Sequence, residues 1–88
     1  MPKNFHLTVI TPEKVIYDGD IASLIVPSEL GFFGVLADHA PLIAGLSKGK
    51  ITLREESGKQ VLFRLNSQGF LEVLKNSVTI LCQEALKA

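Results

Sequence analysis

The sequence has few of the residues from which catalytic and metal sites are usually built. Its 88 residues include one cysteine, two histidines and no tryptophan. Because Cys82 is alone, it can form neither an internal disulfide nor a cysteine-based metal cage, and such a chain fits a reducing compartment. No apolar run approaches the roughly 20 residues that a membrane-spanning helix needs, and no signal peptide pattern begins the chain. We therefore expect a soluble, cytosolic chain.

The charge balance excludes a strong electrostatic attraction to phosphates. Lysine plus arginine total 9 and aspartate plus glutamate total 9, so the formal net charge is zero. The basic residues are also scattered singly along the chain, without the basic stripe that nucleic-acid binding requires. We expect no nucleic acid among the partners.

Hydrophobic residues, in contrast, are abundant for so short a chain. They make up 47% of the sequence, whereas charged residues make up 20%. Since 88 residues offer too little apolar material for two cores, we expect a single domain over residues 1–88. A domain of this size also leaves part of its apolar surface exposed, which is typical of a protein that binds a partner.

Short alternating segments with turn signals about every ten residues predict an antiparallel all-β sandwich or barrel. Asp18–Gly19 is expected to form a turn or bulge, and Pro27 is expected to end a strand. The polar segment 28–31 then reads as an exposed hairpin tip, and the tail 83–88 is too short to hold a helix in water. The expected strands are residues 5–11, 14–17, 21–26, 32–36, 41–46, 51–54, 60–65, 70–74 and 78–82.

Asp38 and His39 form the pair that most resembles part of a catalytic site, because a carboxylate can orient an imidazole for proton transfer. Adjacent residues on an extended chain point to opposite faces, however, and no serine lies in a nucleophile-elbow motif. We therefore expect the pair to serve a turn or an interface, and we expect no catalytic residue in this chain.

The acidic and histidine residues do not have the spacing of a metal site. Asp18, Asp20 and Asp38 lack the loop spacing and the closing glutamate of a calcium hand, and His6 and His39 have no third ligand at a useful distance along the chain. We expect solvated turn carboxylates and no bound metal.

Cysteine and glycine likewise predict structure rather than chemistry. Cys82 lies in an apolar strand with no lysine or arginine beside it, which favours a small core residue over a nucleophile. Gly31, Gly34 and Gly45 are not followed by the helix that a phosphate-binding loop requires. No cofactor site is expected, and the composition is that of an interaction module.

Residues 31–42 resemble a segment of ATP synthase epsilon subunits in which Gly-x-hydrophobic-Gly is followed, after four further residues, by His-Ala-Pro-Leu. Segments 5–11, 69–73 and 78–81 and the Asp18–Gly19 pair are similar to other parts of that family in the same order. The resemblance implies a ten-stranded antiparallel sandwich of two five-stranded sheets at the foot of the central stalk. One side of it would contact the gamma subunit, and its base would contact the polar loops of the membrane-embedded c-ring.

The same resemblance implies a non-catalytic rotor subunit that supports assembly and coupling of ATP synthesis, held at the cytoplasmic side of the energy-transducing membrane through the complex. Besides an interface role, His39 has a second interpretation, as a corner residue that hydrogen-bonds to its own loop. The residues expected at protein interfaces are Thr11, Ser28, Glu29, Leu30, Gly31, Phe32, His39, Ala40, Pro41 and Leu42.

The chain departs from the family pattern at two positions and at its end. Phe32 stands where family members often carry an acidic residue, so contact with the c-ring would depend more on Glu29 or on apolar packing. Gln68 stands where a second glycine is common. Family members commonly continue into a two-helix hairpin that inhibits ATP hydrolysis and in some species contributes to binding ATP, and neither property is expected of residues 1–88.

Two other functions are compatible with a small β domain. A sandwich that binds a small ligand or sugar would rely on exposed aromatic rings, whereas this chain has no tryptophan, one tyrosine and five phenylalanines, most of them at core-like positions. A hydrolase is supported only by the Asp38–His39 pair.

Overall fold

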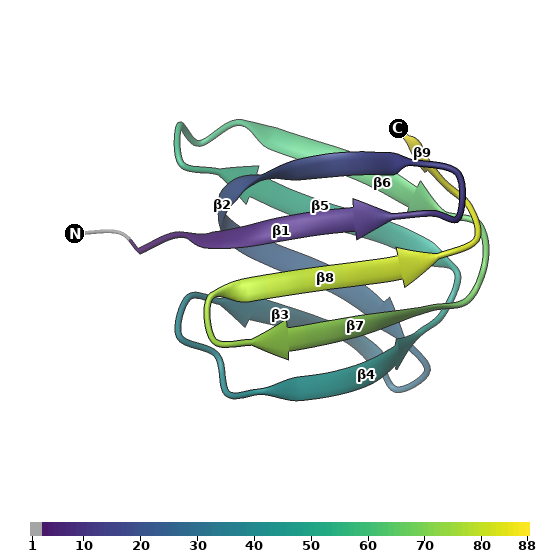
Figure 1. The fold of residues 1–88 in the computed structure, drawn as a ribbon, viewed down its shortest axis with the longest axis horizontal. Helices are drawn as coiled ribbons and strands as arrows, with labels where there is room; N and C mark the ends of the chain where they lie inside the picture. The colour runs from purple at the N-terminus through teal and green to yellow at the C-terminus, as the bar shows by residue number, and fades with distance from the viewer. Residues whose placement is uncertain (1–2) are drawn as a thin grey trace.

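The protein is described over residues 3–88 by a computed structural model, and Figure 1 shows strands stacked in two layers. Among these residues, no helix has the length and hydropathy needed to cross a membrane. The strands are β1 (Phe5–Ile10), β2 (Val15–Ser28), β3 (Gly31–Leu36), β4 (Leu42–Leu46), β5 (Gly49–Glu55), β6 (Gln60–Leu65), β7 (Gly69–Leu74), β8 (Ser77–Cys82) and β9 (Ala85–Lys87).

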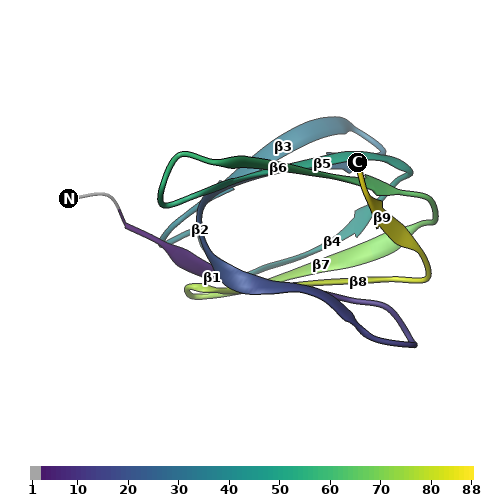
Figure 2. The same ribbon diagram turned by 90° about the horizontal axis from the view of Figure 1, so that it is seen from above.

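The predicted β-sandwich is confirmed, with one long strand shared between its layers. The hydrogen-bonded order is β4-β7-β8-β1-β2-β5-β6-β9, and β3 pairs with β2. Seen from above, β1, β8, β7 and β4 form one layer, whereas β3, β5 and β6 form the other (Figure 2). Because the 14-residue strand β2 bends from the first layer into the second, it contributes to both sheets. The described residues therefore hold nine strands, and the expected ten are reached when the two parts of β2 are counted separately.

The continuity of β2 contradicts two sequence-based expectations. Asp18 and Gly19 do not turn the chain, because they pair with Thr8 and Leu7 of β1. Pro27 does not end the strand either, since β2 continues through it to Ser28. Proline is tolerated there because the pairing of β2 with β5 ends earlier, at Ile25. The local turn signals are outweighed by strand pairing along the whole of β2.

Two further details of the pairing differ from the expectation. The strands β1 and β8 run parallel, with His6 opposite Ser77, so the sandwich is not wholly antiparallel. The tail, for which no strand was expected, contains β9, which pairs with β6 and brings Ala85 opposite Leu65. A three-residue strand gains its stability from this edge pairing and not from local propensity.

The core lies between the two layers and is built by alternation along the strands. In β7, for example, every second residue is buried, beginning with Gly69, and the residues between them are exposed. The buried apolar residues form one cluster that includes Leu7, Leu24, Leu53 and Ile80. No charged or polar residue of the described chain is among the buried residues, so the core is apolar.

Candidate protein interface

The β2–β3 hairpin presents the segment expected to bind a partner. Glu29 and Leu30 form a two-residue turn between the paired residues Ser28 and Gly31. The hydroxyl of Ser28 donates to the carbonyl oxygen of Gly31 over 2.6 Å and accepts the N–H of Leu30 over 3.3 Å. Gly31 has a φ of 114°, a conformation that side chains disfavour. The predicted hairpin tip is confirmed, and its role in binding stays a prediction.

A groove of about 530 Å³ opens beside this tip, at the seam between β3 and β4. Leu30 is fully exposed and Phe32 is 64% exposed, so the groove offers apolar surface to a partner. Glu29 is the one charged residue in its lining, among the described residues. The groove is lined by Ser28, Glu29, Leu30, Gly31, Phe32, Phe33, Leu42, Ala44 and Gly45.

The corner that contains His39 lies between β3 and β4 and is held by hydrogen bonds within its own loop. The Nδ1–H of His39 donates to the carbonyl oxygen of Ala40 over 2.7 Å, because a carbonyl can only accept. His39, Ala40 and Pro41 line a shallow depression together with Lys75. The corner reading of His39 is therefore confirmed, and an interface role remains compatible with it.

Asp38, the neighbour of His39, is committed to other partners. Its carboxylate accepts hydrogen bonds from the Lys3 ammonium over 2.7 Å and from the amide of Asn76 over 3.1 Å. Its own N–H donates to Asn76 over 2.7 Å, which supports a φ of 64° at this residue. The hydrogen bond from Lys3, then the hydrogen bond from Asn76 and the charge of Lys3, lower the pKa of the Asp38 carboxyl. Asp38 thus anchors the loop and does not orient the imidazole of His39.

Thr11 stands in the connection between β1 and β2. Its hydroxyl donates to the carbonyl oxygen of Lys14 over 3.1 Å and accepts the N–H of Lys14 over 3.3 Å. Its own N–H also donates to that carbonyl, over 2.9 Å. The side chain of Thr11 therefore closes this turn, as serine and threonine hydroxyls often do.

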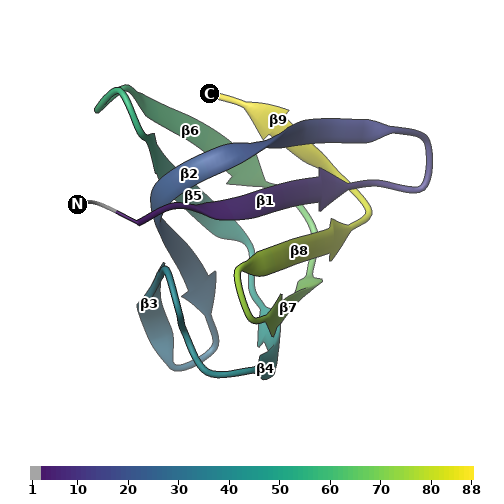
Figure 3. The same cartoon turned by 60° about the vertical axis from the view of Figure 1, so that its left-hand side comes forward.

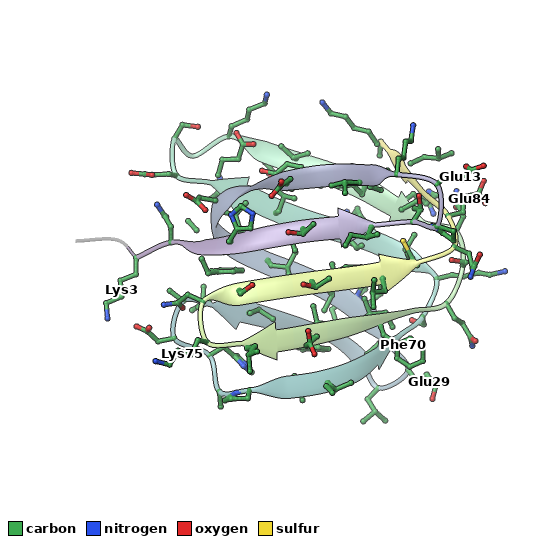
Figure 4. All side chains as sticks on the ribbon, in the orientation of Figure 1. Lys3, Glu13, Glu29, Phe70, Lys75 and Glu84 are labelled. Carbon is green, nitrogen blue, oxygen red and sulfur yellow. The ribbon has the colours of Figure 1, made fainter. Side chains whose placement is uncertain are left out.

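The expected interface residues do not gather in one place. Figure 4 shows Glu29 of the hairpin tip and Lys75 beside the His39 corner at opposite ends of the strands. Leu42 joins the hairpin tip in the apolar groove, whereas His39, Ala40 and Pro41 lie apart from that groove. Thr11 lies near Phe70, with which it lines a small pocket of about 290 Å³. The structure therefore offers two separate regions, the tip groove and the His39 corner.

An exposed apolar face, not recognised in the sequence, lies on the outer side of the first layer. Phe70 of β7 pairs with Leu81 of β8, and both side chains point outward. Ile43 of β4 and Leu74 of β7 are exposed on the same side. We call Ile43, Phe70, Leu74 and Leu81 the outer face. The strict alternation of β7 could have revealed Phe70, because its neighbours Gly69 and Leu71 are the buried positions.

The residues considered for metal binding form no such site. His6 contacts Asp18 through Nε2 and Asp20 through Nδ1, the latter over 2.8 Å. Because the two carboxylates lie on opposite sides of the ring, the three side chains do not converge on one point. Asp38 is elsewhere, bound to Lys3. Within residues 3–88 no group of three histidine, cysteine or acidic side chains has the arrangement of a metal site. Asp18 and Asp20 are strand residues, not the turn carboxylates that were expected.

Cys82 is buried, as its sequence context predicted. Its thiol lies 3.9 Å from the carbonyl oxygen of Ile10. Burial raises the pKa of this thiol, which lowers the fraction of reactive thiolate. The prediction of a core cysteine is confirmed.

Comparison with known proteins shows where this fold belongs. Residues 4–88 match the family described as ATP synthase, Delta/Epsilon chain, beta-sandwich domain. The ATP synthase epsilon chain of Leptospira interrogans is 44% identical over 75 residues, which cover 85% of this chain and 58% of that relative. The epsilon chain of Chlorobaculum tepidum is 39% identical over 82 residues, which cover 93% of this chain and 92% of that relative.

A solved structure gives the same result. A chain in the cryo-EM structure of the Euglena gracilis mitochondrial ATP synthase, OSCP/F1/c-ring in rotational state 1, superposes with a TM-score of 0.91 at 27% identity. The match covers 99% of this chain and 55% of the Euglena chain. The present chain thus spans little more than half of that protein and 58% of the Leptospira relative. With the family match extending over residues 4–88, the chain belongs to the delta/epsilon chain β-sandwich domain family of ATP synthase.

Proposed function

We propose that this chain is a non-catalytic rotor subunit of an ion-translocating ATP synthase, which links the gamma subunit to the c-ring. The observation that carries the proposal is the family match over residues 4–88. It is supported by the Euglena chain of the same fold, which belongs to an ATP synthase assembly containing F1 and the c-ring. We further infer that residues 1–88 act as one domain at the cytoplasmic side of the membrane.

The tip groove suits the c-ring. Its fully exposed Leu30 and largely exposed Phe32 provide an apolar contact, and Glu29 provides one carboxylate at the rim. A short polar loop of a partner could bury an apolar side chain in the groove and pair a basic one with Glu29. The expected contacts are thus Ser28, Glu29, Leu30, Gly31, Phe32 and Leu42.

The gamma subunit is assigned to the outer face. This face lies between Phe70, which borders Thr11, and Lys75 at the other end of the strands (Figure 4), which borders the His39 corner. It carries exposed apolar side chains, of which Phe70 is 62% exposed and Ile43 is 74% exposed. Burying such side chains is the main source of affinity in stable subunit contacts. Thr11, His39, Ala40 and Pro41 would then form its two margins.

A binding experiment with purified partners tests this function. The chain is mixed separately with the gamma subunit and with the c-ring, and complexes are measured by co-precipitation and calorimetry. We expect binding to each at micromolar concentrations, on the order of −8 kcal/mol. If the chain bound neither the gamma subunit nor the c-ring, the proposed rotor function would be refuted. Titration with ATP serves as a further control, and clear binding heat would contradict the absence of a nucleotide site in residues 1–88.

A further inference from the structure

A second seam between the layers lies away from the tip groove and the outer face. The first half of β2 pairs with β1 on one side, while its pairing with β5 begins only at Ile21. Within residues 3–88, the edge of β2 over residues 15–20 and the outer edge of β9 have no strand beside them. In Figure 3, β9 crosses behind β2. Both strands line the same pocket of about 420 Å³.

The floor of this seam is formed by two aromatic side chains that pack on each other. Tyr17 and Phe63 pack edge to face, with ring centroids 5.8 Å apart and an angle of 78° between the planes. The Tyr17 hydroxyl donates to Oε2 of Glu55 over 2.9 Å. Burial, together with Glu55, raises the pKa of Tyr17 to about 12. The floor is therefore a preformed apolar surface whose polar atoms already have partners.

Lysine side chains predominate in the lining of the seam, whereas Asp18 and Asp20, on the same edge of β2 but outside that lining, contact His6. Lys14, Lys59 and Lys87 line the seam, and Glu55 is the one acidic residue in the lining and is already bound to Tyr17. Exposed apolar side chains, Val15 and Leu86, stand beside these lysines. The tip groove has the opposite character, with a single carboxylate and no lysine in its lining. The two seams therefore suit partners of opposite charge.

We propose that the seam between β2 and β9 binds an extended acidic segment of another protein. The segment adds a strand to the free edge of β2, so that its backbone satisfies the open donors and acceptors there. Because side chains alternate along a strand, every second residue can place an apolar group over Tyr17 and Phe63 while the residues between them place carboxylates near the lysines. A second copy of this chain is a poorer occupant, since its own lysines would meet the same rim.

The test uses the 88-residue chain and a short fluorescein-labelled peptide of alternating glutamate and valine. Fluorescence anisotropy measures the affinity, and NMR chemical shifts of labelled protein locate the contact. We expect saturable binding with a Kd below about 1 mM that weakens with added salt. The double substitution Lys14→Glu and Lys87→Glu should raise the Kd at least about fivefold. Lys48→Glu, on a different surface, should leave it unchanged.

Several results would overturn the proposal. They are the absence of saturable binding, equal binding of a matched lysine–valine peptide, and shifts that map to the tip groove instead of residues 14–17 and 85–87. Concentration-dependent dimerisation in sedimentation experiments, with the same residues shifting, would assign the seam to a second copy of the chain. Loss of gamma or c-ring binding leaves this test unaffected, because the peptide assay contains neither partner.

Discussion

Gly69 approaches Leu81 so closely that a Cβ built on Gly69 would lie 2.7 Å from the carbonyl oxygen of Leu81. Gly69 begins β7 and is buried against β8, where the same Cβ would also lie 3.2 Å from the Cβ of Cys82. Its backbone φ is not in the left-handed region, so the constraint is the close contact and not the backbone conformation. The pairing of β7 with β8 requires glycine here.

We therefore expect Gly69→Ala to lower the free energy of unfolding by about 1–3 kcal/mol, because backbone atoms must move to admit the methyl group. Urea unfolding followed by circular dichroism measures the change. Gly45→Ala is the matched control, since a Cβ there meets nothing within 4 Å, and its effect should stay within about 0.5 kcal/mol. If the two variants had equal free energies of unfolding, β7 and β8 could move apart to admit the methyl group without a loss of stability.

The stability of the fold should depend on pH through His6. Hydrogen bonds to Asp20 and Asp18 raise the pKa of His6 above its usual value of 6.5. The folded chain therefore holds this proton more tightly than the unfolded chain does. The stabilisation by protonated His6 is complete when the pH is below the pKa of His6 in the unfolded chain. It is lost as the pH rises through the higher pKa of His6 in the folded chain.

The expected result is a free energy of unfolding of the wild-type chain that falls as the pH rises above about 6.5, the usual pKa of histidine. His6→Gln should remove most of this slope, because glutamine carries no charge, while His39→Gln should retain it. Urea titrations at a series of pH values and low salt provide the measurement. The same slope in both variants would rule out the His6 contacts as its source.

Local sequence signals predicted the hairpin tip and the strands β6 and β7 because each depends on a few neighbouring residues. They failed at Asp18–Gly19, where turn propensity competes with pairing to Thr8 and Leu7 on another strand. Such pairing depends on the whole sheet, so a short stretch of sequence cannot predict it. The strand β9 was missed for the same reason, since its residues are held by β6.

The candidate interface was predictable in part. The glycines and polar residues of the β2–β3 turn identify an exposed tip, but they do not show that Leu42 joins the tip groove. That contact depends on where β4 lies relative to β3. The separation of His39 from the tip likewise follows from β3, which runs the length of the layer between them (Figure 1). The expected interface residues of the hairpin tip and of the His39 corner are close in the sequence, but the fold places them on separate surfaces.

Cys82 should be protected from thiol reagents in the folded chain. Its side chain is buried, and the raised pKa of its thiol reduces the thiolate that reacts. We expect the folded chain to react with a chromogenic disulfide at least about tenfold more slowly than the chain unfolded in guanidinium. Comparable rates would mean that the end of β8 opens readily, and hydrogen exchange of the β8 amides would then be fast as well.

The two proposed rotor contacts should be separable by substitution, because they occupy different surfaces. Phe32→Asp places a charge in the tip groove and should weaken binding to the c-ring at least about tenfold while sparing the gamma subunit. Phe70→Asp places the same charge on the outer face and should have the reverse effect. Both phenylalanines are exposed, by 64% and 62%, so neither change should greatly alter the free energy of unfolding.

Calorimetry of each variant with each purified partner gives the four affinities that decide this assignment, and urea unfolding confirms that both variants fold. If Phe32→Asp weakened binding to gamma and Phe70→Asp weakened binding to the c-ring, the two surfaces would have to be exchanged. Equal losses for both partners would instead indicate one continuous contact region around the end of the strands where Gly45 pairs with Phe70. Since Gly45 also lines the tip groove, that pair marks where the two surfaces adjoin, and only a difference between partners can show that they act separately.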